Sequence, residues 1–151
     1  MKLYRGTKTK KEDGTLKNRY LETPREPTDT NVEIHQLADS WFHNKFGIKA
    51  RSQTIFVSTC QKQASIYSGE HGVIFEVEPV GDYNLIYSAN VDDFLDHTFD
   101  GICGSDAHEI IDWLENKSYC CVDSISSLPE DFKGEVMIYC KEYSVKALPD
   151  I

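Results

Sequence analysis

The sequence predicts an α+β fold built mainly of strands. The expected elements run as a strand, a long loop, a helix and then mostly strands with brief helical insertions, so they do not alternate as β-α-β units. No G-x-G-x-x-G follows a predicted strand, and no G-x-x-x-x-G-K-[ST] occurs. The sequence therefore lacks both Gly-rich phosphate signatures of the parallel nucleotide-binding folds.

The N-terminal part opens with a short strand at 3–4. Residues 7–28 are polar and contain turn-forming prolines, so we expect a long loop there. A helix should follow, because Asp29 or Thr30 can cap its start and Gly47 fits its end. Its apolar side chains recur at helical spacing: Val32, Leu37, Ala38, Trp41 and Phe46.

The remaining chain is expected to hold short strands and short helices. Aromatic and β-branched runs or apolar–polar alternation predict strands at 54–57, 73–77, 83–87, 136–139 and 143–148. Helices are expected at 61–67 and 106–116, with a short helix or turn at 91–97. Pro79 should stop the strand before it, because proline donates no ladder hydrogen bond. Residues 140–142 should join the last two strands.

Length and composition favour one domain over residues 1–151. The chain is 40% hydrophobic, which is enough to bury a core without disulfide or metal staples. The basic, polar N-terminus has no apolar segment typical of a secretory signal, and no run of 18 apolar residues occurs. We therefore expect a cytoplasmic protein that does not bind a membrane.

Formal charge is unevenly distributed along the chain. Residues 1–20 carry a net charge of +5, whereas the remaining 131 residues carry −14. The overall acidity disfavours non-specific binding to nucleic acid. The basic N-terminal stretch is either a solvated loop or a surface that binds a phosphate-bearing ligand.

The cysteines and histidines do not form the spacings of a metal site or a disulfide framework. The number of cysteines is odd, none lies in a C-x-x-C pair, and the histidines show no H-E-x-x-H spacing. We therefore expect no bound metal. The cysteines are Cys60, Cys103, Cys120, Cys121 and Cys140.

Polar residues at three predicted strand ends are candidates for chemistry. Arg5 lies before Gly6, where a guanidinium can bind a phosphate at close range. Ser58 and Thr59 end a strand, and neighbouring hydroxyls can bond a ribose, a phosphate or a carboxylate. Glu135 opens a strand and can stabilise an oxocarbenium ion, as glycosidase carboxylates do. Alternatively, all of these are ordinary solvated or turn-forming residues.

The order and context of these residues resemble the mono-ADP-ribosyltransferases of the Arg–Ser–Glu group, which includes many bacterial toxins. In that family the Arg lies in a stretch like 3–6, and a Ser-Thr-Ser motif ends a strand like 55–57. The Glu opens a Glu-Val-apolar-apolar pattern like 135–138. The resemblance spans residues 3–147, with Cys60 in place of the last Ser of the motif.

The resemblance implies split antiparallel sheets flanked by short helices, with NAD in the cleft between them. By this analogy Arg5, next to Gly6, holds a phosphate of NAD. Thr59 supports the nicotinamide pocket. The family also has a helix that carries a small residue followed by an aromatic residue. Ala64 and Tyr67 occupy these positions here, and by this analogy Tyr67 would stack on the nicotinamide.

The resemblance also implies catalytic roles. Ser58 would orient Glu135, and Glu135 would bond a hydroxyl of the nicotinamide ribose and stabilise positive charge as neutral nicotinamide leaves. Apart from the resemblance, Arg51, Ser52 and Gln53 lie just before a predicted strand and are further candidates for ligand contact.

The acceptor side departs from the family pattern. Lys133 stands two residues before Glu135, where arginine-modifying members carry Glu. A lysine is not an anionic general base near neutral pH, but it can meet a phosphate. Glu130 and Asp131, in the preceding loop, are alternative sources of a base, and Lys133 is alternatively an ordinary solvated loop lysine.

The expected function is therefore NAD-dependent transfer of ADP-ribose to a protein or nucleic acid, by a small bacterial or phage toxin or effector. An antitoxin or inhibitor partner is conceivable. An NAD glycohydrolase or an RNA 2′-phosphotransferase on the same fold is the first alternative. A non-catalytic binding or inhibitor protein, which would use its acidic surface to dock a basic partner, is the second.

Overall fold

The computed structural model describes residues 1–9, 12–28, 30–102 and 107–149. It confirms the α+β class with an antiparallel sheet and few helices. The strands are β1 Leu3–Thr7, β2 Gly14–Lys17, β3 Ile55–Ser58, β4 Val73–Tyr87, β5 Cys120–Val122 and β6 Glu135–Ala147. The helices are α1 Val32–Phe46, α2 Gln61–Ser68, α3 Asp96–Phe99 and α4 Ala107–Asn116, with single 3₁₀ turns η1 Arg19–Leu21 and η2 Ile125–Ser127.

Two long strands, β4 and β6, form the centre of the sheet. They pair with each other from Phe75↔Ala147 to Ile86↔Met137. The strands follow the order β2-β6-β3-β1-β4-β5, and every neighbouring pair is antiparallel. The pairing of β4 with β6 is additional to this order and joins two strands that are not neighbours in it. Strand β1 pairs with β4 along its whole length but with β3 only at Tyr4↔Ser58. The sheet therefore opens between β1 and β3.

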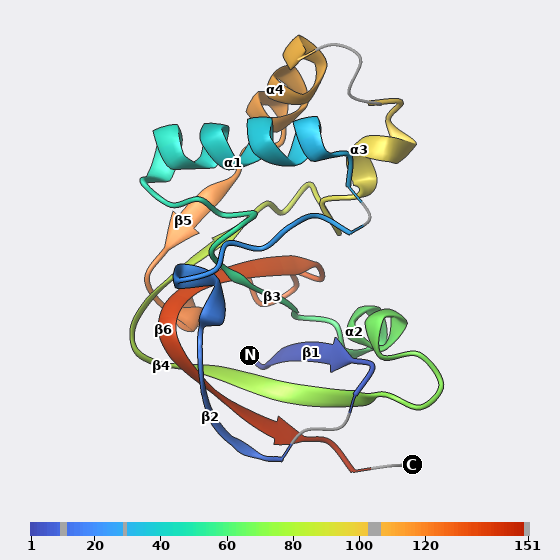
Figure 1. Ribbon diagram of the computed structural model, residues 1–151, viewed down its shortest axis with the longest axis vertical. Helices are drawn as coiled ribbons and strands as arrows, with labels where there is room; N and C mark the ends of the chain where they lie inside the picture. Colours follow the sequence, from blue (N-terminus) through green and yellow to red (C-terminus); the bar gives the residue numbers. More distant parts are fainter. Residues whose placement is uncertain (10–11, 29, 103–106, 150–151) are drawn as a thin grey trace.

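Apolar side chains pack in two clusters. One lies among the strands and includes Leu3, Phe75 and Ile138. The other includes Phe42 and Leu114 and lies where α1 and α4 cover the sheet. Figure 1 shows α1 and α4 together at one end of the molecule, with α2 beside β1 at the other. Burial of both clusters supplies the main favourable free energy of folding.

Helix α1 is confirmed at the predicted position. Its N-cap is Asn31, whose side chain accepts hydrogen bonds from the backbone N–H groups of Glu33 and Ile34. Asn31 was not among the predicted caps, Asp29 and Thr30, and Asp29 lies outside the described residues. Gly47 ends the helix with a φ of 75°, a left-handed conformation that glycine adopts without strain.

The predicted loop at 7–28 is wrong in part, because it contains β2 and η1. Strand β2 pairs with β6 along its backbone, and its one apolar side chain, Leu16, packs partly against the strand cluster, so a mostly polar sequence suffices for this edge strand. The buried Asn18 side chain then joins the segment to the sheet, donating to the carbonyls of Gln53 at 2.9 Å and Cys140 at 3.0 Å. Tertiary hydrogen bonding explains the error.

The predicted breaks at Pro79 and at 140–142 are also wrong, because β4 and β6 each run through. Strand β1 stops at the level of Val77, so Pro79 faces no partner on that side and its missing N–H costs no ladder bond. Helices at 61–67 and 106–116 are confirmed as α2 and α4, although Asp106 lies outside the described residues. Strand β5 was not predicted.

Within the described residues, no helix is both long and apolar enough to cross a bilayer. The described cysteines are all free thiols, and Cys103 lies outside the described residues.

His97 gives the fold a testable dependence on pH. Its ring is fully buried beside Phe94 and Trp113, with Nδ1 2.6 Å from the carbonyl oxygen of Phe94, and its buried Nε2 has no hydrogen-bond partner among the described residues. Burial lowers the pKa of His97 below its ordinary value. Below about pH 6.5 the unfolded state then binds more protons, so the free energy of unfolding falls as pH falls.

We expect His97→Gln to flatten this dependence between about pH 8 and pH 5, by up to about 1.4 kcal/mol per pH unit. The measurement is urea unfolding across that range. His43→Gln, at an exposed position on α1, is the matched control and should behave like the wild type. An unchanged slope in His97→Gln contradicts the prediction.

Candidate functional site

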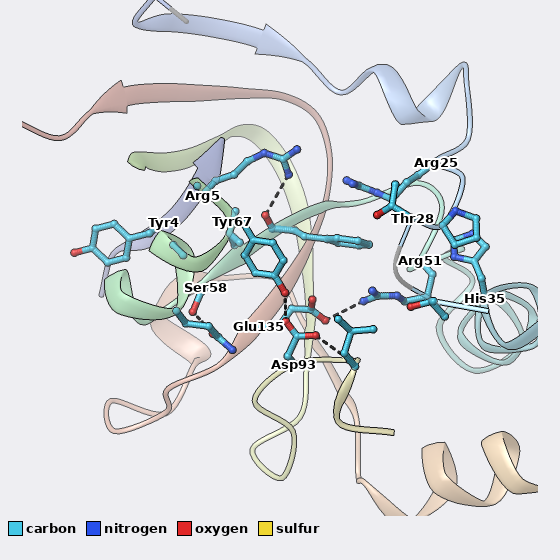
Figure 2. Close-up of a pocket in the computed structure, with 18 of the residues that line it drawn as sticks. Tyr4, Arg5, Arg25, Thr28, His35, Arg51, Ser58, Tyr67, Asp93 and Glu135 are labelled. Atoms are coloured by element: carbon cyan, nitrogen blue, oxygen red, sulfur yellow. Dashed lines mark hydrogen bonds and ion pairs between the residues drawn. The ribbon is translucent and has the colours of Figure 1, made fainter. Parts of the chain in front are cut away.

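A pocket lies where β1 parts from β3. Its walls come from β1, β3, α2, the segment before α1 and the segment before α3 (Figure 2). Five of the eight predicted site residues line it: Arg5, Gly6, Ser58, Tyr67 and Glu135. The opening between two strands thus brings together residues that are up to 130 positions apart in the sequence.

Strand register places two of the three predicted catalytic residues side by side. Ser58 pairs with Glu135 across β3 and β6, and Tyr4, next to Arg5, pairs with Ser58 across β1 and β3. Residues that pair directly across antiparallel strands have neighbouring side chains. Backbone pairing therefore brings Ser58 beside Glu135. Arg5 follows Tyr4 on β1, so its side chain leaves the opposite face of that strand and joins the site by reaching the carbonyl of Phe56 on β3.

Glu135 forms a buried ion pair with Arg51. The Arg51 Nη1 group donates to Glu135 Oε1 at 2.9 Å, and the two side chains are only 8% and 12% exposed. Burial raises the pKa of Glu135 above its ordinary value, whereas the positive charge of Arg51 opposes that rise. The site thus holds a buried carboxylate whose negative charge is favoured mainly by contact with the Arg51 guanidinium.

Arg25 enters the same pocket from the segment before α1. Its guanidinium lies between the rings of Tyr20 and Phe56, 3.9 Å from each ring centroid, and Nη2 donates to the carbonyl of Thr54 at 3.1 Å. Burial, together with the charges of Arg5 and Arg51, lowers the pKa of Arg25 to about 10. At neutral pH Arg25 is still a cation, surrounded by rings rather than by carboxylates.

Arg5 and Arg25 have no acidic partner among the described residues. Arg5 donates to the carbonyl of Phe56 at 3.2 Å, and its guanidinium points into the pocket toward that of Arg25 (Figure 2). Two positive groups that face each other without a carboxylate form a site for an anion. A phosphate or diphosphate matches this charge.

Ser58 does not orient Glu135 as the resemblance implied. Its hydroxyl donates to Gln63 Oε1 and accepts from the backbone N–H of Cys60 at 3.0 Å. Gln63 in turn donates to the carbonyl of Asp92 at 2.6 Å, the same oxygen that accepts the Glu135 backbone N–H. Ser58 therefore helps to fix the backbone around the site, and the side chain that contacts the Glu135 carboxylate is Arg51.

Three other predicted residues lie outside the pocket lining. The Thr59 hydroxyl donates to the carbonyl of Phe132 at 2.8 Å and accepts from the N–H of Gly134 at 3.1 Å, so it holds the turn before β6. Lys133 and Glu130 are exposed on that segment. Both remain available to a molecule that approaches from outside.

Tyr67, on α2, closes one side of the pocket. Its hydroxyl donates to Asp93 Oδ2 in the segment before α3. Partial burial and this bond raise the pKa of Tyr67. The aromatic side chain thus stands over Glu135 and is held by a carboxylate from the opposite wall (Figure 2).

Arg25, His35 and Asp93 line the pocket but were not predicted. Each lies in a segment without a motif: Arg25 in the polar stretch expected to be a loop, His35 on a helix and Asp93 in an acidic run. Arg51 was expected to contact a ligand, but its pairing with Glu135 was not foreseen. The described residues contain no cluster of three or more His, Cys, Asp or Glu that could hold a metal.

No protein-family model, no curated protein and no solved structure matches this chain. The geometry of the pocket is therefore the main evidence for function.

Gly6 tests how the pocket wall is built. A Cβ on Gly6 would lie 2.0 Å from the carbonyl oxygen of Ala64, so α2 packs directly on the β1 backbone. Gly6→Ala should displace α2, which carries Gln63 and Tyr67, and should destabilise the fold by about 1–3 kcal/mol. Thermal or urea unfolding measures this. Ile66, on the outer face of α2, is 75% exposed, so the control variant Ile66→Ala should change stability little. Equal stability of the Gly6→Ala and Ile66→Ala variants would contradict the predicted contact between α2 and β1.

Proposed function

We propose that this protein is an NAD-dependent ADP-ribosyltransferase that transfers ADP-ribose to a macromolecule and releases nicotinamide. The observation that carries the proposal is the meeting of Arg5, Ser58 and Glu135 in one pocket. Their sequence contexts suggested this chemistry, and an anion site beside a buried carboxylate is what that chemistry needs.

The charge pattern of the pocket fits the parts of NAD. The diphosphate would lie between the guanidinium groups of Arg5 and Arg25, which lack carboxylate partners in the described structure. The nicotinamide would stack against Tyr67, and the attached ribose would then lie at Glu135. One end of the pocket thus binds phosphate while the other stabilises positive charge.

The reaction follows from this arrangement. The bond between C1′ of the ribose and the nicotinamide nitrogen breaks, and its electron pair leaves with neutral nicotinamide. Positive charge spreads over the ribose, and the Glu135 carboxylate stabilises it while accepting a hydrogen bond from a ribose hydroxyl. A nucleophile of the acceptor then bonds to C1′ and loses its proton.

Lys133 and Glu130, exposed beside β6, are the proposed acceptor-side residues. A protein or a nucleic acid is the proposed acceptor, with Lys133 suited to a phosphate of the latter. We further propose that the chain acts in the cytoplasm as a bacterial or phage toxin or effector and that an antitoxin is its partner.

The direct test is transfer of label from radiolabelled NAD into a bacterial lysate. Glu135→Gln keeps the shape of the side chain but removes its charge, so transfer should fall by about 100-fold or more. Glu142→Gln, exposed on the same strand, is the matched control and should retain wild-type transfer. Full activity of a folded Glu135→Gln variant would overturn the assignment of this residue.

The same assay separates the alternatives. Label removed by protease indicates a protein acceptor, and label removed by nuclease indicates a nucleic acid. Nicotinamide release without transferred label indicates a glycohydrolase. If neither label nor nicotinamide appears, the proposal fails and a binding or inhibitor protein becomes the better account.

Binding measurements test the phosphate-binding arginines separately from catalysis. Arg5→Gln and Arg25→Gln should each weaken NAD binding by about 10- to 100-fold, because each removes a charge-assisted hydrogen bond. Binding of nicotinamide alone should not change. Arg19→Gln, at an exposed arginine outside the pocket lining, is the control in isothermal titration. Equal NAD affinity of Arg25→Gln and the wild type would show that the diphosphate does not bind between Arg5 and Arg25.

A further inference from the structure

We infer that Arg51 is the positioning residue of Glu135, taking the role that the family resemblance assigned to Ser58. This inference rests on the proposed function. Arg51 is the only described residue whose side chain donates a hydrogen bond to the Glu135 carboxylate. Ser58, directly across the strand pair, directs its hydroxyl to Gln63 instead.

Arg51 is held in place more firmly than an ordinary surface arginine. The Asp39 carboxylate on α1 accepts from the backbone N–H groups of Arg51 and Ser52, each at 3.0 Å, and from the Ser52 hydroxyl at 2.6 Å. The Arg51 guanidinium also lies over the rings of Phe56 and Phe94, at 4.1 and 4.2 Å from their centroids. Helix α1 thus fixes the turn, and the two rings fix the guanidinium.

The ion pair leaves part of the carboxylate free for a ligand. Arg51 contacts Oε1, and no described residue donates a hydrogen bond to Oε2. Glu135 lines the pocket, so Oε2 can accept from a ribose hydroxyl while Oε1 remains bound to Arg51. Such an arrangement orients a carboxylate without consuming both of its oxygens.

Several charged or titratable groups surround Glu135. Among these charges, Arg51 has the largest effect on the pKa of Glu135. Asp93, from the segment before α3, raises its proton affinity, while Arg25, from the segment before α1, lowers it. Arg5 from β1, His35 from α1 and Tyr67 from α2 also line this pocket, and the buried Tyr119 interacts with Glu135 electrostatically. Arg51 is the opposite charge in direct contact, so its removal should let Glu135 bind a proton at higher pH.

The test compares Arg51→Met with Arg51→Lys in the full chain. In Arg51→Met the acid limb of the pH profile for NAD turnover should move upward by about 1–3 pH units. The plateau kcat should fall at least about tenfold while KM for NAD stays within about twofold, because Arg51 acts through Glu135. Arg51→Lys keeps the charge and should recover most of the acid limb. Lys117→Met, which removes the partly exposed ion pair with Asp100 away from the pocket, should match the wild type.

A second readout does not require activity. Carbon-13 NMR of labelled glutamate follows the titration of the Glu135 carboxyl, identified by the signal missing in Glu135→Gln. Its midpoint should rise in Arg51→Met and change less in Arg51→Lys. This outcome in a protein that does not turn over NAD would support Arg51 as positioning residue and overturn the proposed function. Unchanged titration and an unchanged pH profile in folded Arg51→Met would overturn the inference.

Discussion

Backbone pairing on both edges of β6 is the constraint on which the site depends. Around Met137 and Ile138, β6 is paired to β3 on one side and to β4 on the other. Glu135 therefore starts a strand that cannot shift without breaking two ladders. On the other side of β3, β1 pairs with β3 at only one residue pair. The pocket lies where these two strands separate. A fixed carboxylate and an open strand edge thus arise from the same sheet.

Electrostatics divides the pocket into two parts. Burial disfavours an isolated charge, and the Arg51–Glu135 pair meets that cost through direct contact between the opposite charges. Arg5 and Arg25 instead face the pocket with backbone carbonyls and aromatic rings as their partners. The protein therefore retains positive charge that a ligand can neutralise. This asymmetry favours an anionic ligand, and the proposed binding of NAD rests on it.

The sequence indicated the elements with strong local patterns and missed those defined by tertiary contacts. Helix α1 and strand β3 were predictable because apolar spacing and β-branched residues identify them locally. Strand β2 and the continuity of β4 through Pro79 depend on which neighbour is present, which no local pattern encodes. The same holds for the site: strand-end contexts indicated Arg5, Ser58 and Glu135, whereas Arg25 and the Arg51–Glu135 pair appear only once distant segments meet.

The most direct test of the account is a crystal structure of the Glu135→Gln variant with NAD. The account predicts the diphosphate between Arg5 and Arg25, the nicotinamide against Tyr67 and a hydroxyl of its ribose at position 135. NAD bound with its ribose away from position 135, or a pocket that stays empty at saturating NAD while the variant is folded, would contradict it.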